Sequence, residues 1–215
     1  MSFPTASVEI AWTRKVMFAL ELIDPVSFEL VSDGVAVSAT GLTGRPIVNH
    51  SGQFVWLAEA ATPLRVQVNP GALRYEAEDL PAPVPPARLL RIVLRPRPGY
   101  VVPGGVTAVA SSLYQHLPSD PVPATDADAW LQWKDASGGV GGAWIDAAPR
   151  SHTAASGDFL ALLRLDASRV PELDATGQLR LRLAFERAGV VRTSADLFLP
   201  QGRTADLAPF AWDLL

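Results

Sequence analysis

The sequence predicts an all-β chain that folds as two tandem β-sandwich domains. Its apolar runs are short, and several alternate strictly between apolar and polar residues, as strands with one buried face do. Its 19 prolines and 16 glycines fall mainly between these runs, where turns are expected. A turn motif, Ser-Gly-x-Phe followed by an apolar stretch, occurs at Ser51–Phe54 and again at Ser156–Phe159. This repeat suggests two copies of one plan.

Six strands are expected in the first half: Val16–Ile23, Val35–Ala39, Ile47–Val48, Phe54–Leu57, Leu64–Val68 and Leu89–Leu94. In Leu64–Val68, apolar residues alternate with Arg65 and Gln67, which predicts one buried and one solvated face. The stretch Tyr75–Arg88 is rich in proline, so we expect an extended loop there.

The second half is expected to repeat this order with the strands Val106–Leu113, Ala129–Trp133, Ala143–Ile145, Phe159–Leu165, Leu179–Phe185 and Val190–Leu199. Ala129–Trp133 would correspond to Val35–Ala39, and Leu179–Phe185 to Leu64–Val68. Gly138–Gly142 indicates a hairpin tip, and Ala167–Ala175 is expected to hold one helical turn.

The segment Arg95–Tyr100 marks the predicted domain boundary, because its alternating prolines make a short, stiff connector. We therefore expect a first sandwich with an N-terminal arm over residues 1–95, a proline-rich linker over 96–103, and a second sandwich over 104–215. In the arm, Val8, Ile10 and Trp12 alternate with polar or small residues. The arm would either pair with the sheet edge of a neighbouring subunit or form the first strand of its own sandwich.

Composition excludes several classes of protein. The net charge is −4 and lysine occurs only at Lys15 and Lys134, so a nucleic-acid partner is not expected. Cysteine is absent, which excludes disulfides and thiolate metal sites. The sequence shows no signal peptide, no lipidation motif and no apolar run of ~18 residues, which predicts cytoplasmic synthesis and no membrane span.

Residue order then points to a family. Ser32–Val37, Gly44–Pro46 and Ser51–Phe54 in the first half, and Thr153–Leu160 in the second, resemble the carboxypeptidase regulatory-like, or transthyretin-like, β-sandwich. The resemblance implies two tandem Ig-like or transthyretin-like sandwiches with an accessory, adhesive, stalk or scaffold role. Hydroxyisourate hydrolases of that family end in a Tyr-Arg-Gly-Ser-type tail, whereas this chain ends in Trp212–Leu215. That activity is therefore not expected.

No catalytic, cofactor-binding or metal-binding residues are expected. The histidines occur singly, without the spacing of metal ligands, at His50, His116 and His152. There is no Gly-x-Ser-x-Gly nucleophile motif. The acidic loop with Asp120, Asp126 and Asp128 lacks the glycine and glutamate of an EF-hand, and Gly138–Gly142 lacks the lysine of a phosphate loop.

The tryptophans offer two interpretations, a place in the core or at a subunit contact, or a stacking platform for carbohydrate. Trp130 and Trp133 are three residues apart on one strand, so one is expected in the core and the other on a surface. The candidate binding or interface residues are Trp12, Trp133, Trp144, Phe210 and Trp212.

These observations predict a non-enzymatic structural or adaptor protein that assembles with itself or with protein partners as a homo- or hetero-oligomer. A component of a bacterial, phage-tail-like contractile injection particle would fit, because such a particle is built in the cytoplasm and then released. Two alternatives remain. One is a carbohydrate- or ligand-binding module that uses exposed tryptophans. The other is an enzyme with a site between the domains, where Arg45, His50 and His152 would converge.

Overall fold

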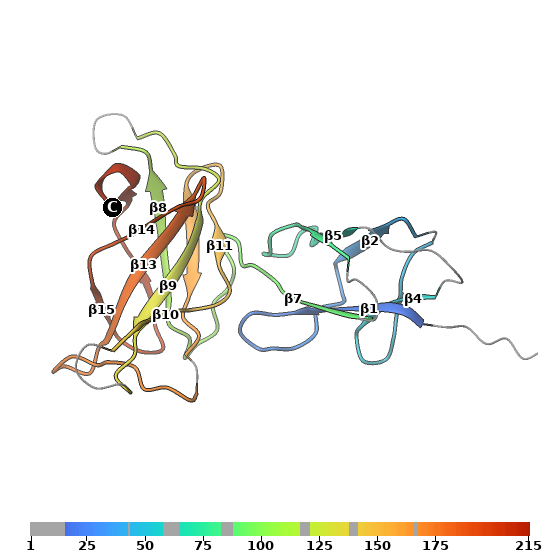
Figure 1. Cartoon of the computed structure of the whole chain (residues 1–215), viewed down its shortest axis with the longest axis horizontal. Helices are drawn as coiled ribbons and strands as arrows, with labels where there is room; N and C mark the ends of the chain where they lie inside the picture. The colour runs from blue at the N-terminus through green and yellow to red at the C-terminus, as the bar shows by residue number, and fades with distance from the viewer. Residues whose placement is uncertain are drawn as a thin grey trace, which may run out of the picture.

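The computed structural model confirms the all-β class (Figure 1). It describes residues 16–42, 44–57, 65–82, 88–116, 121–137, 142–165 and 167–215. Within these ranges, seventeen strands are joined by turns and loops, and the only helix is a 3-10 turn at Trp212–Leu214. No helix in this part of the chain is long and apolar enough to cross a membrane. The N-terminal arm, with Trp12, and most of the Gly138–Gly142 segment lie outside the described residues.

Seven strands make up the first half. They are β1 (Val16–Ile23), β2 (Ala36–Thr40), β3 (Ile47–Val48), β4 (Phe54–Leu57), β5 (Arg65–Asn69), β6 (Glu78–Pro81) and β7 (Leu89–Val93). They form one sheet in the order β3-β4-β1-β7 and a second in the order β2-β5-β6. Side chains of both sheets, such as Phe18, Trp56 and Val66, join in one buried cluster. The alternation of apolar residues thus places one face of each sheet in a shared core.

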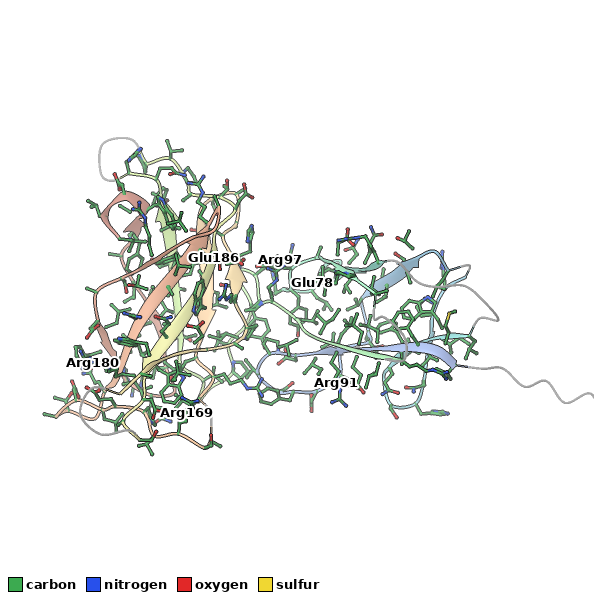
Figure 2. All side chains as sticks on the ribbon, in the orientation of Figure 1. Glu78, Arg91, Arg97, Arg169, Arg180 and Glu186 are labelled. Carbon is green, nitrogen blue, oxygen red and sulfur yellow. The ribbon has the colours of Figure 1, made fainter. Side chains whose placement is uncertain are left out.

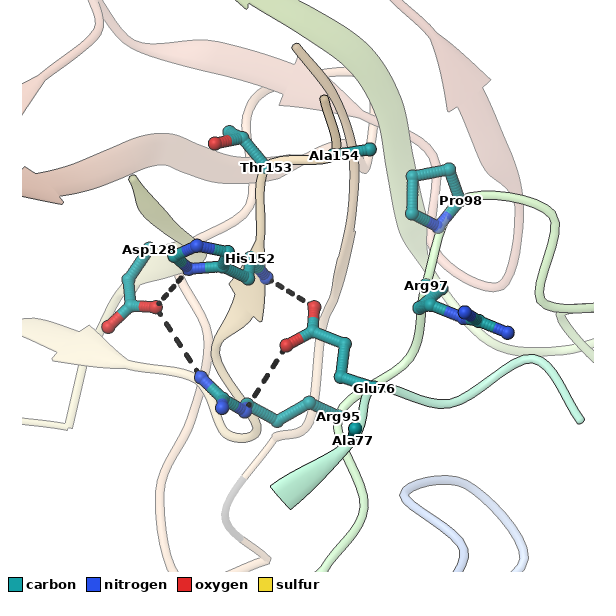
Figure 3. A pocket seen from close by; sticks show the side chains of 9 residues that line it. All are labelled: Glu76, Ala77, Arg95, Arg97, Pro98, Asp128, His152, Thr153 and Ala154. Carbon is teal, nitrogen blue, oxygen red and sulfur yellow. Dashed lines mark hydrogen bonds and ion pairs between the residues drawn. The ribbon is translucent and has the colours of Figure 1, made fainter. Parts of the chain in front are cut away.

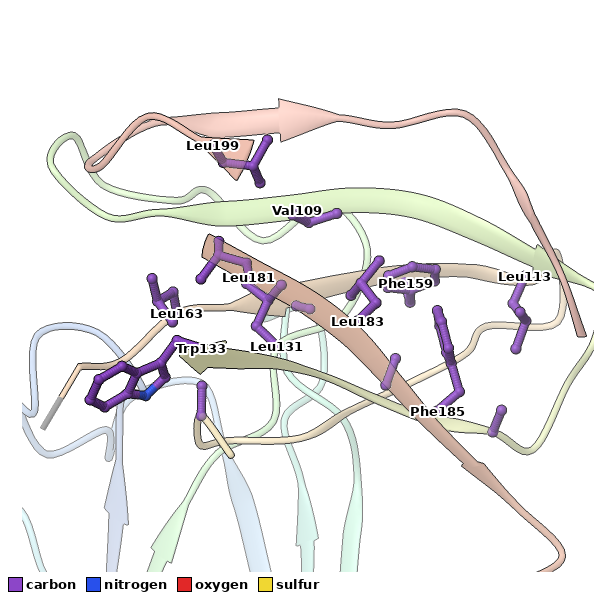
Figure 4. Close-up of a cluster of buried hydrophobic side chains, with 14 of the residues drawn as sticks. Val109, Leu113, Leu131, Trp133, Phe159, Leu163, Leu181, Leu183, Phe185 and Leu199 are labelled. Carbon is purple, nitrogen blue, oxygen red and sulfur yellow. The ribbon is translucent and has the colours of Figure 1, made fainter. Parts of the chain in front are cut away.

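Ten strands make up the second half. They are β8 (Ala108–Tyr114), β9 (Asp128–Lys134), β10 (Trp144–Asp146), β11 (Ser151–His152), β12 (Asp158–Leu162), β13 (Leu179–Arg187), β14 (Val190–Thr193), β15 (Leu197–Leu199), β16 (Thr204–Asp206) and β17 (Phe210–Ala211). One sheet runs β10-β9-β13-β14, with β11 also on β9 and β15 also on β13. The other runs β12-β8-β16, with β17 also on β8. A second buried cluster, with Trp133, Phe159 and Phe185, joins these sheets (Figure 4).

The two halves repeat one pattern of strand pairing. The first strand of each half, β1 or β8, is antiparallel to β4 or β12 and parallel to a late strand, β7 or β16. The other sheet repeats the antiparallel series β2-β5-β6 as β9-β13-β14. These pairings agree with the correspondences expected from the sequence, in which β9 matches β2 and β13 matches β5.

The repeated Ser-Gly turn has the same geometry in both copies. Gly52 and Gly157 have φ angles of 80° and 84°, in the left-handed region that glycine adopts without a steric penalty. In each turn the glycine N–H donates to the carbonyl three residues earlier, at 3.0 and 2.8 Å. Gly177, with φ of 81°, makes the same bond at 3.1 Å in a hairpin that lacks the serine and phenylalanine. The turn therefore does not require the serine and phenylalanine. The first copy closes the β3–β4 hairpin, whereas the second connects β11 and β12, which belong to different sheets.

Three local predictions were wrong. The expected loop Tyr75–Arg88 contains β6, because its first residues are free of proline and Pro81 only ends an edge strand. The expected turn of helix at Ala167–Ala175 is absent from the described residues there, since Pro171 and Leu173 form isolated β-bridges instead. The expected single strand Val190–Leu199 is split into β14 and β15. Between them the Ser194 hydroxyl accepts the Leu183 N–H at 3.0 Å and interrupts the ladder.

The two halves lie end to end, and the connector (residues 96–103) runs between them (Figure 1). Among the described residues, their two buried clusters share no member. Each half thus has its own core, and the geometry between the halves depends on the contacts at their junction.

Candidate functional site

The two halves meet at a pocket of about 410 Å³ (Figure 3). Its walls are Glu76, Ala77, Arg95, Arg97, Pro98, Asp128, His152, Thr153 and Ala154. The first five belong to the β5–β6 loop and the segment after β7, and the others to β9, β11 and the loop after β11. Figure 2 shows Glu78 and Arg97 at the end of the first half that faces the second. Four ionisable side chains, those of Glu76, Arg95, Asp128 and His152, therefore converge where the halves touch, whereas Arg97 points away from them and donates to the Leu73 carbonyl at 2.9 Å.

Arg95 is the centre of this cluster. Its guanidinium donates to both carboxylate oxygens of Glu78, from Nε to Oε1 at 2.7 Å and from Nη2 to Oε2 at 3.1 Å. It also lies 3.4 Å from Oε2 of Glu76 and 3.6 Å from Oδ1 of Asp128. Burial by itself lowers the pKa of Arg95, but the three carboxylates together raise it. Arg95 is therefore held charged between two carboxylates of its own half and one of the other half.

Glu76 makes a second polar link between the halves. Its Oε1 accepts the backbone N–H of His152 at 2.7 Å. Burial raises the pKa of Glu76, although the His152 N–H and the charge of Arg95 act in the opposite direction. The His152 ring lies 3.1 Å from Oδ1 of Asp128, measured from Nδ1, and 3.8 Å from Oδ1 of Asp126, measured from Nε2.

An apolar contact lies beside the polar one. Val26 from the first half and Tyr100 from the connector pack on the outer face of the β12-β8-β16 sheet, against Ala108, Leu160 and Leu162. The guanidinium of Arg164 lies over the ring of Phe28, with Cζ 4.1 Å from its centroid. Burial of this apolar surface and the cation–π contact stabilise the same relative placement of the halves.

Asp24 fixes the connector to the first half. Its Oδ2 accepts hydrogen bonds from the phenols of Tyr75 at 2.6 Å and Tyr100 at 2.9 Å, and its Oδ1 accepts the N–H groups of Val26 and Ser27. Burial by itself raises the pKa of Asp24, but these four hydrogen bonds lower it below its ordinary value. Burial and the adjacent carboxylate raise the pKa of both phenols well above the usual value.

The acids and bases at this junction are mostly paired with one another, which indicates a structural contact. Of the three residues that would converge in an enzyme, only His152 lines the pocket, whereas Arg45 and His50 are exposed elsewhere in the first half. No group of three or more His, Cys, Asp or Glu side chains with metal-binding geometry occurs among the described residues. The clearest chemical effect of the arrangement is to hold two β units together.

The predicted tryptophan sites differ in burial, because Trp133 is buried and Trp144 is partly exposed. Trp133 was expected on a surface as an alternative to Trp130, but both are buried. Trp133 points into the second core, and the opposite face of β9 at Trp130 is covered by Arg150, whose Cζ lies 3.8 Å from the ring centroid. A residue on the outer face of a sheet is thus buried by a neighbouring side chain. Trp144 is partly exposed on that same outer face.

The predicted residues at the C-terminus dock on the second half. Phe210 lies in β17 beside Leu113 of β8, and its ring centroid is 5.8 Å from that of Phe185. Trp212 packs on the same core, with the Arg192 guanidinium over its ring. Both side chains are partly buried, so this chain itself covers much of the apolar surface that was expected to meet a partner.

Sequence reasoning missed the cluster around Arg95. The available signal was the pair Glu76 and Glu78, which are two residues apart and so share a face in an extended chain. Their partner Arg95 lies seventeen residues beyond Glu78, and Asp128 lies in the other half. Only the tertiary fold brings these residues together.

Comparisons with protein-family models, curated proteins and solved structures found no match to this chain.

Proposed function

We propose that this chain is a non-enzymatic structural adaptor in which two β-sandwich modules are held at a fixed angle. The observation that carries the proposal is the contact of Glu76 and Arg95 with His152 and Asp128 across the junction. Ionisable groups that line an interdomain pocket are often free to bind a ligand, but here most of them bind one another. A rigid two-module body suits a protein that sets the distance between other proteins.

The proposed modules are transthyretin-like or Ig-like sandwiches that span residues 1–95 and 104–215, with residues 96–103 as the linker. The repeated strand pairing of the two halves supports this division. In the sequence, the resemblance of each half to that family points the same way. Protein partners, including further copies of this chain, would then join modules that are already oriented.

Partner binding in this proposal uses the open edges of the sheets. β3 ends one sheet and exposes Ile47 and Val48. β14 ends another and exposes Val190 and Val191. Apolar residues on edge strands favour pairing with another chain. A place in a phage-tail-like contractile injection particle, assembled in the cytoplasm and then released, is the biological setting that we infer.

Rigidity can be measured directly, because the chain has no cysteine. Asp33→Cys and Ala175→Cys place one spin label on an exposed turn of each half, and pulsed electron resonance then gives the distribution of distances between them. A single narrow distribution is expected. A distribution as broad as that of freely jointed modules would contradict the adaptor proposal.

Assembly needs its own experiment. Light scattering after size-exclusion chromatography over a range of concentrations, together with affinity capture from the native host, should find self-association or co-purifying structural proteins. A chain that stays monomeric and captures no partner would count against the proposed role.

A further inference from the structure

The outer face of the sheet that contains β10, β9, β13 and β15 carries two aromatic side chains in one row, of which Phe198 is exposed and Trp144 is partly exposed. Trp144 of β10 pairs with Lys134 of β9, and Phe198 of β15 pairs with Arg180 of β13. The register between β9 and β13 brings Lys134 beside Arg180, because Leu181 pairs with Trp133. Neighbouring strands are ~4.8 Å apart, so the two aromatic positions are about 14 Å apart across the sheet.

Both aromatic residues point away from the core. On β15, Leu197 packs on the core and Leu199 is buried, while Phe198 between them is 45% exposed. Trp144 is partly exposed. Arg182 and Lys134 lie over its indole ring, with Cζ and Nζ at 4.3 and 5.3 Å from the ring centroid. Because Arg182 belongs to β13, two strands away from β10, the indole leans across the sheet.

A row of polar groups runs beside the aromatic row. Gln132 donates from Nε2 to Oδ1 of Asp146 at 2.6 Å and accepts at Oε1 from Nε of Arg182 at 2.6 Å. These three residues lie on β10, β9 and β13, in the order Asp146, Gln132, Arg182. Each side chain is held by its neighbour and retains further donors or acceptors, so the row offers fixed hydrogen-bonding groups beside Trp144.

The charges of this face balance. Between Trp144 and Phe198 the cations are Lys134, Arg180 and Arg182, and the carboxylates are Asp146, Glu172 and Asp196. Farther along the same face, Arg150 pairs with Glu186 at 2.6 Å and lies 3.8 Å from Asp146. Arg180 forms ion pairs with Glu172 at 2.8 Å and with Asp196 at 2.6 Å. A face without net charge does not attract polyanions, and its charged groups serve as hydrogen-bonding partners.

We propose that this face binds a neutral oligosaccharide chain that lies across the strands. The apolar face of a sugar ring stacks on Trp144 at one end and on Phe198 at the other, since aromatic side chains offer a flat apolar surface. Hydroxyl groups between them bind the Asp146, Gln132 and Arg182 row. The open sheet favours an extended polymer over a small ligand, which needs a concave pocket.

This binding site is separate from the contact between the halves. Arg180 lies on the side of the second half that is remote from the first half (Figure 2). Saccharide binding therefore goes beyond the adaptor function, and either proposal can fail without the other.

Affinity electrophoresis of the full chain tests the proposal, with separate gels that contain a soluble β-glucan, galactomannan, xyloglucan, amylose or the acidic polymer alginate. At least one neutral polymer should retard the protein. Trp144→Ala and Phe198→Ala should each weaken that retardation by about tenfold, and Trp144→Phe should retain part of it. Val191→Ala is the matched control, because it shortens another exposed side chain at the edge of the same sheet.

Circular dichroism and urea unfolding show that each variant is folded before its binding is compared. Retardation by alginate alone would overturn the assignment of a neutral ligand. Absence of retardation in every neutral polymer, or equal retardation of the wild type and the folded Trp144→Ala variant, would overturn the site.

Discussion

The phenol of Tyr100 donates a 2.9 Å hydrogen bond to Oδ2 of Asp24, and the same Tyr100 side chain packs on the outer face of the second half. One residue of the connector therefore touches both halves. Tyr75 donates to the same carboxylate oxygen at 2.6 Å but comes from the first half itself. Substitutions at these two tyrosines can therefore distinguish an effect on the stability of the first half from an effect on the geometry between the halves.

Tyr100→Phe should broaden the distribution of distances between the spin labels on the two halves. The variant keeps the ring but loses a hydrogen bond to a charged acceptor, which contributes about 1.5–3 kcal/mol. Tyr75→Phe is the control. It should lower the free energy of unfolding by a similar amount in urea titrations while the distance distribution stays narrow. If both variants broaden the distribution equally, Tyr100 has no special role in orientation.

Arg95→Ala should destabilise the chain by about 1.5–3 kcal/mol, because it removes the charged hydrogen bonds to Glu78 and leaves Glu76 and Asp128 without their shared cation. Arg65→Ala removes an ion pair with Asp79 that is about half exposed on both sides. Such pairs contribute about 0–1 kcal/mol, so this control should have little effect. Urea titration gives the free energies of unfolding of Arg95→Ala and Arg65→Ala. Equal losses of stability in the two variants would refute a central role for Arg95.

Most strands were predictable from the sequence because the information for them is local, whereas β6, β11, β16 and β17 were not expected as strands. β1, β3 and β4 have the predicted bounds, since apolar alternation and flanking turn residues define them. The Arg95 cluster was not predictable, because Glu76 and Asp128 are distant in sequence and either would be an ordinary surface charge alone. Burial of Trp130 on an outer face also depends on a distant residue, Arg150. Short-range patterns specify the strands, and long-range pairing creates the sites.

The lowered pKa of Asp24 predicts how the free energy of unfolding depends on pH. Hydrogen bonds lower the pKa of this carboxyl in the folded chain from its ordinary value of 3.8. A lowered folded pKa contributes stability that is present above pH 3.8 and is lost as the pH falls through the folded value. Asp24→Asn should therefore be less stable than the wild type at pH 7, and the difference should shrink as the pH falls below 3.8 and through the lowered folded pKa of Asp24. Urea titrations at a series of pH values measure the difference in free energy of unfolding between the wild type and Asp24→Asn. A difference that does not change with pH would contradict this explanation.

The contribution of Glu76 to stability should change with pH in the opposite direction to that of Asp24. Burial raises its pKa above the ordinary 4.5, so its contribution to stability is fully present below pH 4.5 and is lost as the pH rises through the folded value. Glu76→Gln keeps an acceptor for the His152 N–H without the buried charge. The variant should gain stability relative to the wild type as the pH rises from 4 to 7. A relative loss over that interval would mean that the ion pair with Arg95 outweighs burial.

Gly157 and Gly52 have the same turn geometry but different surroundings. A Cβ atom at Gly157 would lie 2.5 Å from the carbonyl oxygen of Leu113, whereas at Gly52 the nearest atom would be 3.4 Å away, in the side chain of Leu30. Both positions have positive φ, which costs a non-glycine residue about 1–2 kcal/mol. Gly52→Ala should therefore destabilise the chain by about that amount, and Gly157→Ala by clearly more, because backbone of β8 must also move. Urea titration of the two variants measures the difference. Equal losses of stability in the two variants would mean that β8 can move away from a Cβ atom at Gly157 without a loss of stability. The close approach of β8 to Gly157 would then not constrain the fold.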